Sequence, residues 1–248
     1  MSALADDIDA CCGSPRIMAL DIGGGLSVNY NSDAVSPSFE EYKNTILKIV
    51  PNFFKQNSSR TIVTEFGKSL VAKAGVVVAL VQDVLDLTRA GEGETRDGTH
   101  QIAITHAGAD LFLRTAYCPE SFSHRIEHLD GKGQRPGCNR SRATLTIAGP
   151  LCFSGDILAR DMQGCEARSG DRMVVLDAGA NTLSLFSRHC SRRSPRVIGC
   201  RRLRAAEAVG AAEDSSAPTA TSTGYGTELR VSILRDEETF GSVMSFWD

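Results

Sequence analysis

Three consecutive glycines, Gly23, Gly24 and Gly25, end an apolar run of strand length that begins at Arg16. Glycine has no side chain to keep an anion away from the backbone, so such a loop lets several N–H groups converge on a phosphate. An ordinary turn uses the same residues, and the glycines alone leave both interpretations open.

A strand, a helix and a second strand would bring another loop to the same place. Ser38 and Glu41 form a capping box at the start of an amphipathic helical pattern, which Pro51 kinks or ends. Residues 60–65 are rich in β-branched side chains and run into a loop at residues 66–68. Parallel strands joined by a helix place their loops at one edge of the sheet, so the sequence predicts a βαβ unit with neighbouring loops.

After Gly75 the pattern changes to short apolar runs separated by polar, glycine-rich loops, which is typical of an antiparallel β-domain. The expected strands lie in residues 76–87, 101–105, 111–116, 143–147, 173–176 and 229–234. Residues 205–226 are dominated by Ala, Ser, Thr and Gly and have the composition of a linker or long surface loop. We therefore expect two parts, residues 1–75 and residues 76–248.

Four motifs in a fixed order resemble those of one enzyme family. They are Gly-Gly-Gly at 23–25, Glu-Phe-Gly-Lys at 65–68, Cys-Phe-Ser-Gly-Asp at 152–156 and Asp-Ala-Gly-Ala-Asn at 177–181. The set resembles the C-terminal half of the fold-type III pyridoxal-phosphate decarboxylases, the ornithine/diaminopimelate/arginine decarboxylase family. The resemblance implies an α+β protein in which the last two βα units of a TIM-type barrel precede an antiparallel β-barrel or sandwich domain.

The resemblance also assigns a cofactor, pyridoxal 5′-phosphate (PLP), and the residues that would hold it. The first loop would give backbone N–H groups to the phosphate, and Glu65 would pair with the pyridinium nitrogen. Lys68 stands where the family has Arg, so a point charge replaces a bidentate fork. The full expected cofactor set is Gly23, Gly24, Gly25, Glu65, Gly67, Lys68 and Asn181, with Asn181 in place of the family's Tyr.

Two further residues carry catalytic roles in the same resemblance. Cys152 would be the acid that returns a proton to the carbanionic intermediate, and Asp156 would contact the distal amine of an amino-acid substrate. In the family both reach across a dimer interface. Phe153 stands where diaminopimelate decarboxylases have a Glu, which disfavours diaminopimelate as the substrate.

One functional residue of the family has no counterpart here. Its Schiff-base lysine lies far upstream of the triple glycine, whereas only 22 residues precede Gly23 and none of them is Lys. A complete barrel takes about 250 residues. We therefore expect a truncated chain that is inactive alone, forming a homodimer or a dimer with a full-length paralogue. The alternative is a non-catalytic β-domain that serves only dimerisation or interaction with such a paralogue.

Composition excludes several other classes. The chain has 248 residues, 42% hydrophobic and 23% charged, with a formal net charge of −3, which is ordinary for a globular protein and does not favour nucleic-acid coating. No apolar run approaches the roughly 18 residues of a membrane span. Eight scattered cysteines without a C-x-x-C pair and an acidic N-terminus predict free thiols and a cytoplasmic protein without a metal site.

Three weaker sequence signals also have ordinary structural explanations. His124 and His128 fit the H-x-x-E-H pattern of one metalloprotease group, but the surrounding residues alternate as in a strand, which favours ordinary strand histidines. Seven arginines between Arg188 and Arg204 form a basic patch without aromatic residues, which favours a solvated face over a nucleic-acid site. Cys152 is also compatible with a hydrolase nucleophile or a buried structural thiol.

Overall fold

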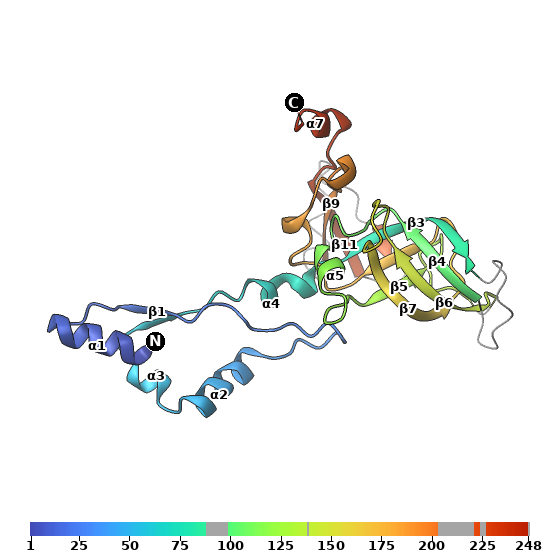
Figure 1. Ribbon diagram of the computed structural model, residues 1–248. Coiled ribbons are helices and arrows are strands. Elements are labelled where there is room, and N and C mark those ends of the chain that lie inside the picture. Colours follow the sequence, from blue (N-terminus) through green and yellow to red (C-terminus); the bar gives the residue numbers. More distant parts are fainter. Residues whose placement is uncertain (88–98, 138, 203–220, 224–226, 248) are drawn as a thin grey trace. The chain divides into compact units, whose positions relative to one another are not determined.

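The computed structural model describes residues 1–87, 99–137, 139–202, 221–223 and 227–247 (Figure 1). By contacts the chain divides into two units, Met1–Phe186 and Ser187–Asp248. The domain boundary predicted after residue 75 falls inside the first unit and stays a prediction. Among the described residues, no helix has the length and apolar character needed to cross a membrane.

The first unit begins with short helices around a two-stranded sheet. Its elements are α1 (Ser2–Cys12), β1 (Ala19–Asp21), α2 (Phe39–Ile49), α3 (Phe53–Gln56), β2 (Thr61–Val63), α4 (Gly67–Val71) and the 3-10 turn η1 (Ala72–Ala74). Strands β1 and β2 pair in parallel, with Asp21 opposite Val63. The predicted βαβ unit is confirmed, and α4 completes a second βα unit.

Helix α2 starts where the capping box predicts. The Ser38 hydroxyl accepts the Glu41 N–H at 3.1 Å, and a Glu41 carboxylate oxygen accepts the Ser38 N–H at 2.6 Å. These hydrogen bonds, first of all that from the Ser38 backbone, lower the pKa of Glu41. The helix ends at Ile49, just before Pro51, as expected for a residue that cannot continue a helix.

Helix α1 was not expected from the sequence, and an ion-pair cluster holds it against the start of β2. The Arg60 guanidinium contacts Asp6 and Asp9, each at 2.7 Å. Asp9 also accepts the backbone N–H groups of Arg16 and Ile17, and together these contacts lower its pKa to about 2. A helix fixed by distant charges leaves little local signal, since tertiary contacts rather than propensity stabilise it.

The larger part of the first unit is a curved six-stranded sheet (Figure 1). Its strands are β3 (Val77–Asp86), β4 (Thr99–Thr105), β5 (Ile126–Leu129), β6 (Arg142–Ala148), β7 (Ile157–Cys165) and β8 (Arg172–Val175), in the order β5-β8-β3-β4-β6-β7. The β-domain prediction is confirmed, with one correction: β4 and β6 pair in parallel, whereas all other neighbours are antiparallel.

Residues 111–116, expected to be a strand, form α5 (Leu113–Tyr117) instead. The Asp110 carboxylate accepts the N–H groups of Gly108 and Leu111, and the Gly108 carbonyl accepts that of Phe112. This turn directs the chain into a helix, and the strand prediction was wrong because a short apolar run fits either element.

The hydrophobic core lies on the inner face of the sheet. Val81, Leu145, Ile147 and Met173 are fully buried, and they come from three different strands, β3, β6 and β8. Alternation along β6, where buried and half-buried residues take turns, gives the half-buried strand pattern expected from the sequence.

The second unit contains a 3-10 turn, η4 (His189–Ser191), and a three-stranded antiparallel sheet of β9 (Val197–Arg202), β10 (Thr221–Thr223) and β11 (Thr227–Arg235), followed by α7 (Phe240–Met244). Three arginines of the predicted basic patch pair with acidic residues that follow β11: Arg188 with Glu238, Arg193 with Glu237 and Arg196 with Asp236. This pairing supports the solvated-face interpretation. The predicted linker at 205–226 lies outside the described residues except for β10.

A buried carboxylate joins three parts of the first unit. Asp171 contacts the Arg140 guanidinium through both oxygens, accepts the Arg168 N–H at 2.9 Å and lies 2.9 Å from His128 Nε2. Burial acts to raise the pKa of Asp171, but the hydrogen bonds from Arg140, His128 and Arg168 outweigh it, so the pKa lies below its usual value. The carboxylate therefore stays charged inside the fold.

We predict that Asp171→Ala lowers the free energy of unfolding by about 3–5 kcal/mol, because it leaves the Arg140 charge buried without a partner. Urea unfolding followed by circular dichroism measures this. Removing Arg135, which is 80% exposed beside Glu127, is the control and should cost less than about 1 kcal/mol. A comparable loss in both variants would contradict the assignment.

The same carboxylate predicts acid sensitivity. A carboxyl whose pKa is lower in the folded state stabilises the fold above its unfolded-state pKa, and this stability is lost as the pH falls through the folded pKa. The wild-type chain should therefore lose stability below about pH 4, and Asp171→Ala should show a flatter profile in urea melts across that range. Parallel profiles would exclude Asp171 as a source of the acid sensitivity.

Candidate functional site

The two glycine-containing loops emerge at one edge of the β1–β2 pair. Residues 23–25 follow β1 and residues 65–68 follow β2, and the Glu65 N–H donates to the Gly23 carbonyl at 2.9 Å. A Cβ added to Gly24 would lie 3.1 Å from the Glu65 carbonyl oxygen. The loops are in contact, as the parallel pairing predicts.

The first loop has the backbone of an anion-binding turn. Gly23 and Gly25 have φ of 73° and 101°, a region that glycine reaches without strain. The Gly23 N–H is already used, because it donates to the Asp21 carboxylate at 2.8 Å. Within the described residues the N–H groups of Gly24 and Gly25 have no acceptor, so these two can receive a phosphate oxygen.

The second loop opens into a pocket of about 570 Å³. The pocket residues come from two segments far apart in the sequence: Gly67, Lys68, Leu70 and Val71, and Gly179, Ala180, Asn181, Thr182, Leu183 and Ser184. Three predicted cofactor residues, Gly67, Lys68 and Asn181, therefore meet at one place. Asn181 has φ of 56°, a left-handed conformation that Asn tolerates better than most residues.

Two glycines hold the walls of this pocket together. A Cβ on Gly179 would lie 1.9 Å from the Val71 carbonyl oxygen, and a Cβ on Gly75 would lie 2.5 Å from the Gly179 Cα. The Gly179 N–H donates to the Ala72 carbonyl at 3.0 Å. The backbone approach is too close for any side chain, which explains why glycine is required at both positions.

Lys68 is half-buried at the pocket, and its ammonium group is poorly solvated. Burial is the main cause that lowers its pKa, and the nearby positive charge of Arg114 adds to the effect. The Arg114 guanidinium also lies 4.0 Å from the centre of the Phe122 ring. Sequence reasoning missed Arg114, because it lies on the helix α5 that was predicted to be a strand.

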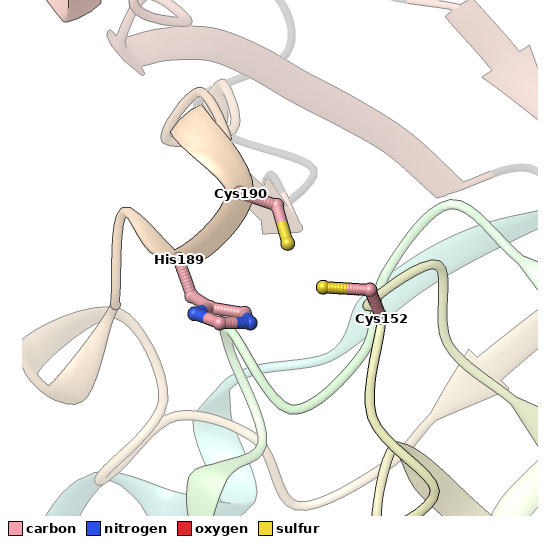
Figure 2. A group of neighbouring side chains, drawn as sticks. All are labelled: Cys152, His189 and Cys190. Carbon is pink, nitrogen blue, oxygen red and sulfur yellow. The ribbon is translucent and has the colours of Figure 1, made fainter.

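The two predicted catalytic residues do not line the pocket. Cys152 is exposed on the loop between β6 and β7, as is its neighbour Phe153. Figure 2 shows Cys152 on this loop and His189 and Cys190 on η4, which belongs to the second unit. Cys152 therefore lies at the surface of the single chain, which disagrees with its interpretation as a buried thiol.

Asp156, in contrast, is only 3% exposed. Its two carboxylate oxygens accept the N–H groups of Ala109 and Leu151, each at 2.6 Å. A Cβ on Gly108 or Gly149 would lie within 2.4 Å of the same carboxylate. Asp156 therefore fixes two loops to the start of β7, and its assigned contact with a substrate stays a prediction.

The H-x-x-E-H histidines are both committed to hydrogen bonds. His124 Nδ1 donates to the Leu176 carbonyl at 2.9 Å, and its ring packs edge-on against Tyr30, Phe112 and Phe122. Burial lowers the pKa of His124, so the neutral ring is favoured. His128 binds Asp171 as described. These contacts support the interpretation as strand histidines.

Comparison with known proteins agrees with this geometry. Residues 7–72 match the family model for the pyridoxal binding domain of pyridoxal-dependent decarboxylases. The diaminopimelate decarboxylase of Haemophilus influenzae is 30% identical over 173 residues, which are 70% of this chain and 36% of that protein. The enzyme of Aquifex aeolicus is 27% identical over 175 residues, again 36% of its length.

Solved structures show the same fold. A diaminopimelate decarboxylase from Helicobacter pylori complexed with L-lysine has a TM-score of 0.67 at 19% identity, over 99% of this chain and 49% of that one. A lysine decarboxylase from Selenomonas ruminantium has a TM-score of 0.56 at 20% identity, over 77% and 44% of the two chains.

Residues 7–72 are therefore similar to the pyridoxal binding domain of the pyridoxal-dependent decarboxylases, and the chain shares the fold of a diaminopimelate decarboxylase, with the barrel-fragment and β-domain arrangement that the motifs predict. The named curated relatives are diaminopimelate decarboxylases, and the chain spans about 36% of their length. This share agrees with the expectation of a chain shorter than the family's enzymes.

Part of the expected PLP set lines this pocket, namely Gly67, Lys68 and Asn181, whereas the first loop and Glu65 are not among the lining residues. The pocket volume of about 570 Å³ is in the usual range for a cofactor of this size. The unbonded N–H groups of Gly24 and Gly25 suit a phosphate, and Lys68 and Arg114 supply positive charge.

We predict that Gly179→Ala destabilises the first unit by about 1–3 kcal/mol or more, because the new methyl group must displace the Val71 carbonyl. Thermal unfolding measures the loss. Gly67→Ala is the matched control on the opposite wall, since a Cβ there meets nothing within 4 Å. Equal melting temperatures for the two variants would show that the close approach does not hold the pocket together.

Proposed function

We propose that this chain binds PLP in the pocket between the second loop and residues 179–184, as part of a PLP-dependent amino-acid decarboxylase. The convergence of Gly67, Lys68 and Asn181 on one pocket carries this proposal. Gly67 and Lys68 belong to one motif and Asn181 to another, so the meeting of the two motifs at one pocket supports the proposal.

Each loop has a defined task in the proposal. Gly24 and Gly25 bind the phosphate through their N–H groups, and Lys68 or Arg114 balances its charge. Glu65 holds a proton at the pyridinium nitrogen, as the family resemblance implies. When bound, PLP takes up the electron pair that remains on the substrate after CO₂ leaves. Gly67 leaves open space beside the pocket, since no atom lies within 4 Å of its Cβ position.

The chain in a single copy lacks part of the proposed machinery. Cys152 is exposed on a loop outside the pocket, and Asp156 is buried among backbone N–H groups. We therefore place Cys152 at the pocket of a second subunit, either another copy or a full-length paralogue. The substrate is a small amino acid, and the apolar ring of Phe153 argues against a distal group that needs a carboxylate there.

We expect PLP to bind at least about tenfold more tightly than pyridoxal, which lacks the phosphate, because the loop N–H groups and the nearby cations contact that phosphate. Quenching of the protein fluorescence during titration measures both affinities, and inorganic phosphate should compete. The chain alone should release no CO₂ from lysine, ornithine or diaminopimelate. Equal affinities for PLP and pyridoxal would contradict the phosphate site.

The dimer is favoured by the exposed apolar side chain of Phe153 beside Cys152, which is 44% exposed in the single chain. Light scattering of the purified chain should give the mass of a dimer, and Phe153→Asp should weaken association by about tenfold or more, because it places a charge in an apolar contact. Val35→Asp, at a 73% exposed residue, is the control. A strictly monomeric wild-type chain would refute a homodimer, and failure to co-purify with a full-length paralogue would refute the heterodimer.

A further inference from the structure

Asp177 is a buried carboxylate at the start of the fourth motif, and it lies between two cations. Its side chain is 4% exposed. Lys73 Nζ lies 3.2 Å from one carboxylate oxygen, and the Arg125 guanidinium lies 3.1 Å from the other. None of the three is among the described residues that line the pocket assigned to PLP. Their ion pairs therefore act on the segments around the pocket rather than on a ligand inside it.

The Lys73 ammonium group connects three segments of the chain. Besides Asp177, it contacts the backbone carbonyl oxygens of Asn29 and Ser32, the latter at 2.6 Å. An ammonium group has three N–H donors, so these three oxygens use all of them. Lys73 lies on η1, directly after α4. It thus joins the chain after the second loop to the fourth motif and to the chain that follows the first loop.

Arg125 makes a second link between the same carboxylate and the chain after the first loop. Its guanidinium lies 2.8 Å from the Asp33 carboxylate and donates to Asp177 through two nitrogens, at 3.2 Å and 3.3 Å. Residues 29–33 begin only four residues after Gly25. The two links therefore hold the segment into which the first loop runs.

We propose that Asp177, acting through Lys73 and Arg125, is a positioning residue that holds the first loop in the conformation that receives the phosphate. This inference rests on the proposed cofactor site. Strand β1 fixes the chain before the loop, and residues 29–33 fix the chain after it. A loop held at both ends loses less conformational freedom when it binds, so it binds its ligand more tightly.

The opposite charges of Lys73 and Asp177 separate positioning from simple electrostatics. Lys73→Met removes a positive charge, and Asp177→Asn removes a negative one. If the two residues acted on a phosphate only through their charge, the first variant would weaken phosphate binding and the second would strengthen it. A positioning role predicts that both variants weaken it, because each one breaks the same contact.

The test compares the affinities of the full-length chain for PLP and for pyridoxal, measured by fluorescence quenching. We expect Lys73→Met and Asp177→Asn each to lower the PLP affinity by about tenfold, because displaced N–H groups lose the phosphate, whereas the affinity for pyridoxal should change by less than about twofold.

Asp171→Asn is the matched control. Asp171 is another buried carboxylate, 3% exposed, but its partners Arg140 and His128 belong to none of the four motifs. This variant should lower the melting temperature without changing the ratio of the PLP and pyridoxal affinities. All titrations are made at a temperature at which circular dichroism shows each variant to be folded.

Three results would overturn the positioning role while leaving the cofactor site intact: an unchanged ratio of affinities in both site variants, tighter PLP binding by Asp177→Asn, or an equal loss in Asp171→Asn. A wild-type chain that does not prefer PLP over pyridoxal would instead refute the cofactor site. Should Asp177→Asn fail to fold, Lys73→Arg takes its place. It keeps the positive charge but not the compact ammonium group, so positioning predicts weaker PLP binding and a charge effect predicts no change.

Discussion

The close approach of Gly179 to Val71 and Gly75 is the contact on which the rest of the site depends. Hydrogen bonds from Ala178 to the Gly75 carbonyl and from Gly179 to the Ala72 carbonyl lock the segment after α4 against the segment after β8. The second loop runs into the first turn of α4, and Asn181 lies two residues after Gly179. The pocket therefore exists because two backbone segments meet without side chains between them. Each of these segments adjoins, in the chain, a site residue: Lys68 in one case and Asn181 in the other.

A second set of contacts fixes the chain that follows the first loop. Lys73 binds the carbonyl groups of Asn29 and Ser32, and Arg125 bridges Asp33 and the buried Asp177. Tyr30 completes this attachment by packing its ring edge-on against two rings of the β-domain, Phe122 and His124, and burial raises the Tyr30 pKa. Charged and aromatic contacts thus join the β1–β2 part to the larger sheet.

Local sequence patterns were enough to predict many of the helices and strands. The elements that were not predicted depend on contacts between residues far apart in the sequence. The capping box at Ser38 and the β-branched run before Glu65 act within a few residues, so the elements were predictable. Helix α1 depends on Arg60, and α5 depends on the turn at Asp110, contacts that no local pattern contains. The convergence of Lys68 and Asn181 was predictable only through motif resemblance, whereas Arg114 lay outside every motif used.

The first loop places an electrostatic condition on cofactor binding. The Gly23 N–H donates to the Asp21 carboxylate. A phosphate held by the N–H groups of Gly24 and Gly25 would therefore lie close to this carboxylate, and both groups are negatively charged. Like charges at short range disfavour binding unless a cation compensates. Lys68, which lies on the second loop, and Arg114, whose charge acts on Lys68, are the cations that can supply this compensation. The affinity for a phosphate at the first loop therefore depends on charges that the second loop and helix α5 carry.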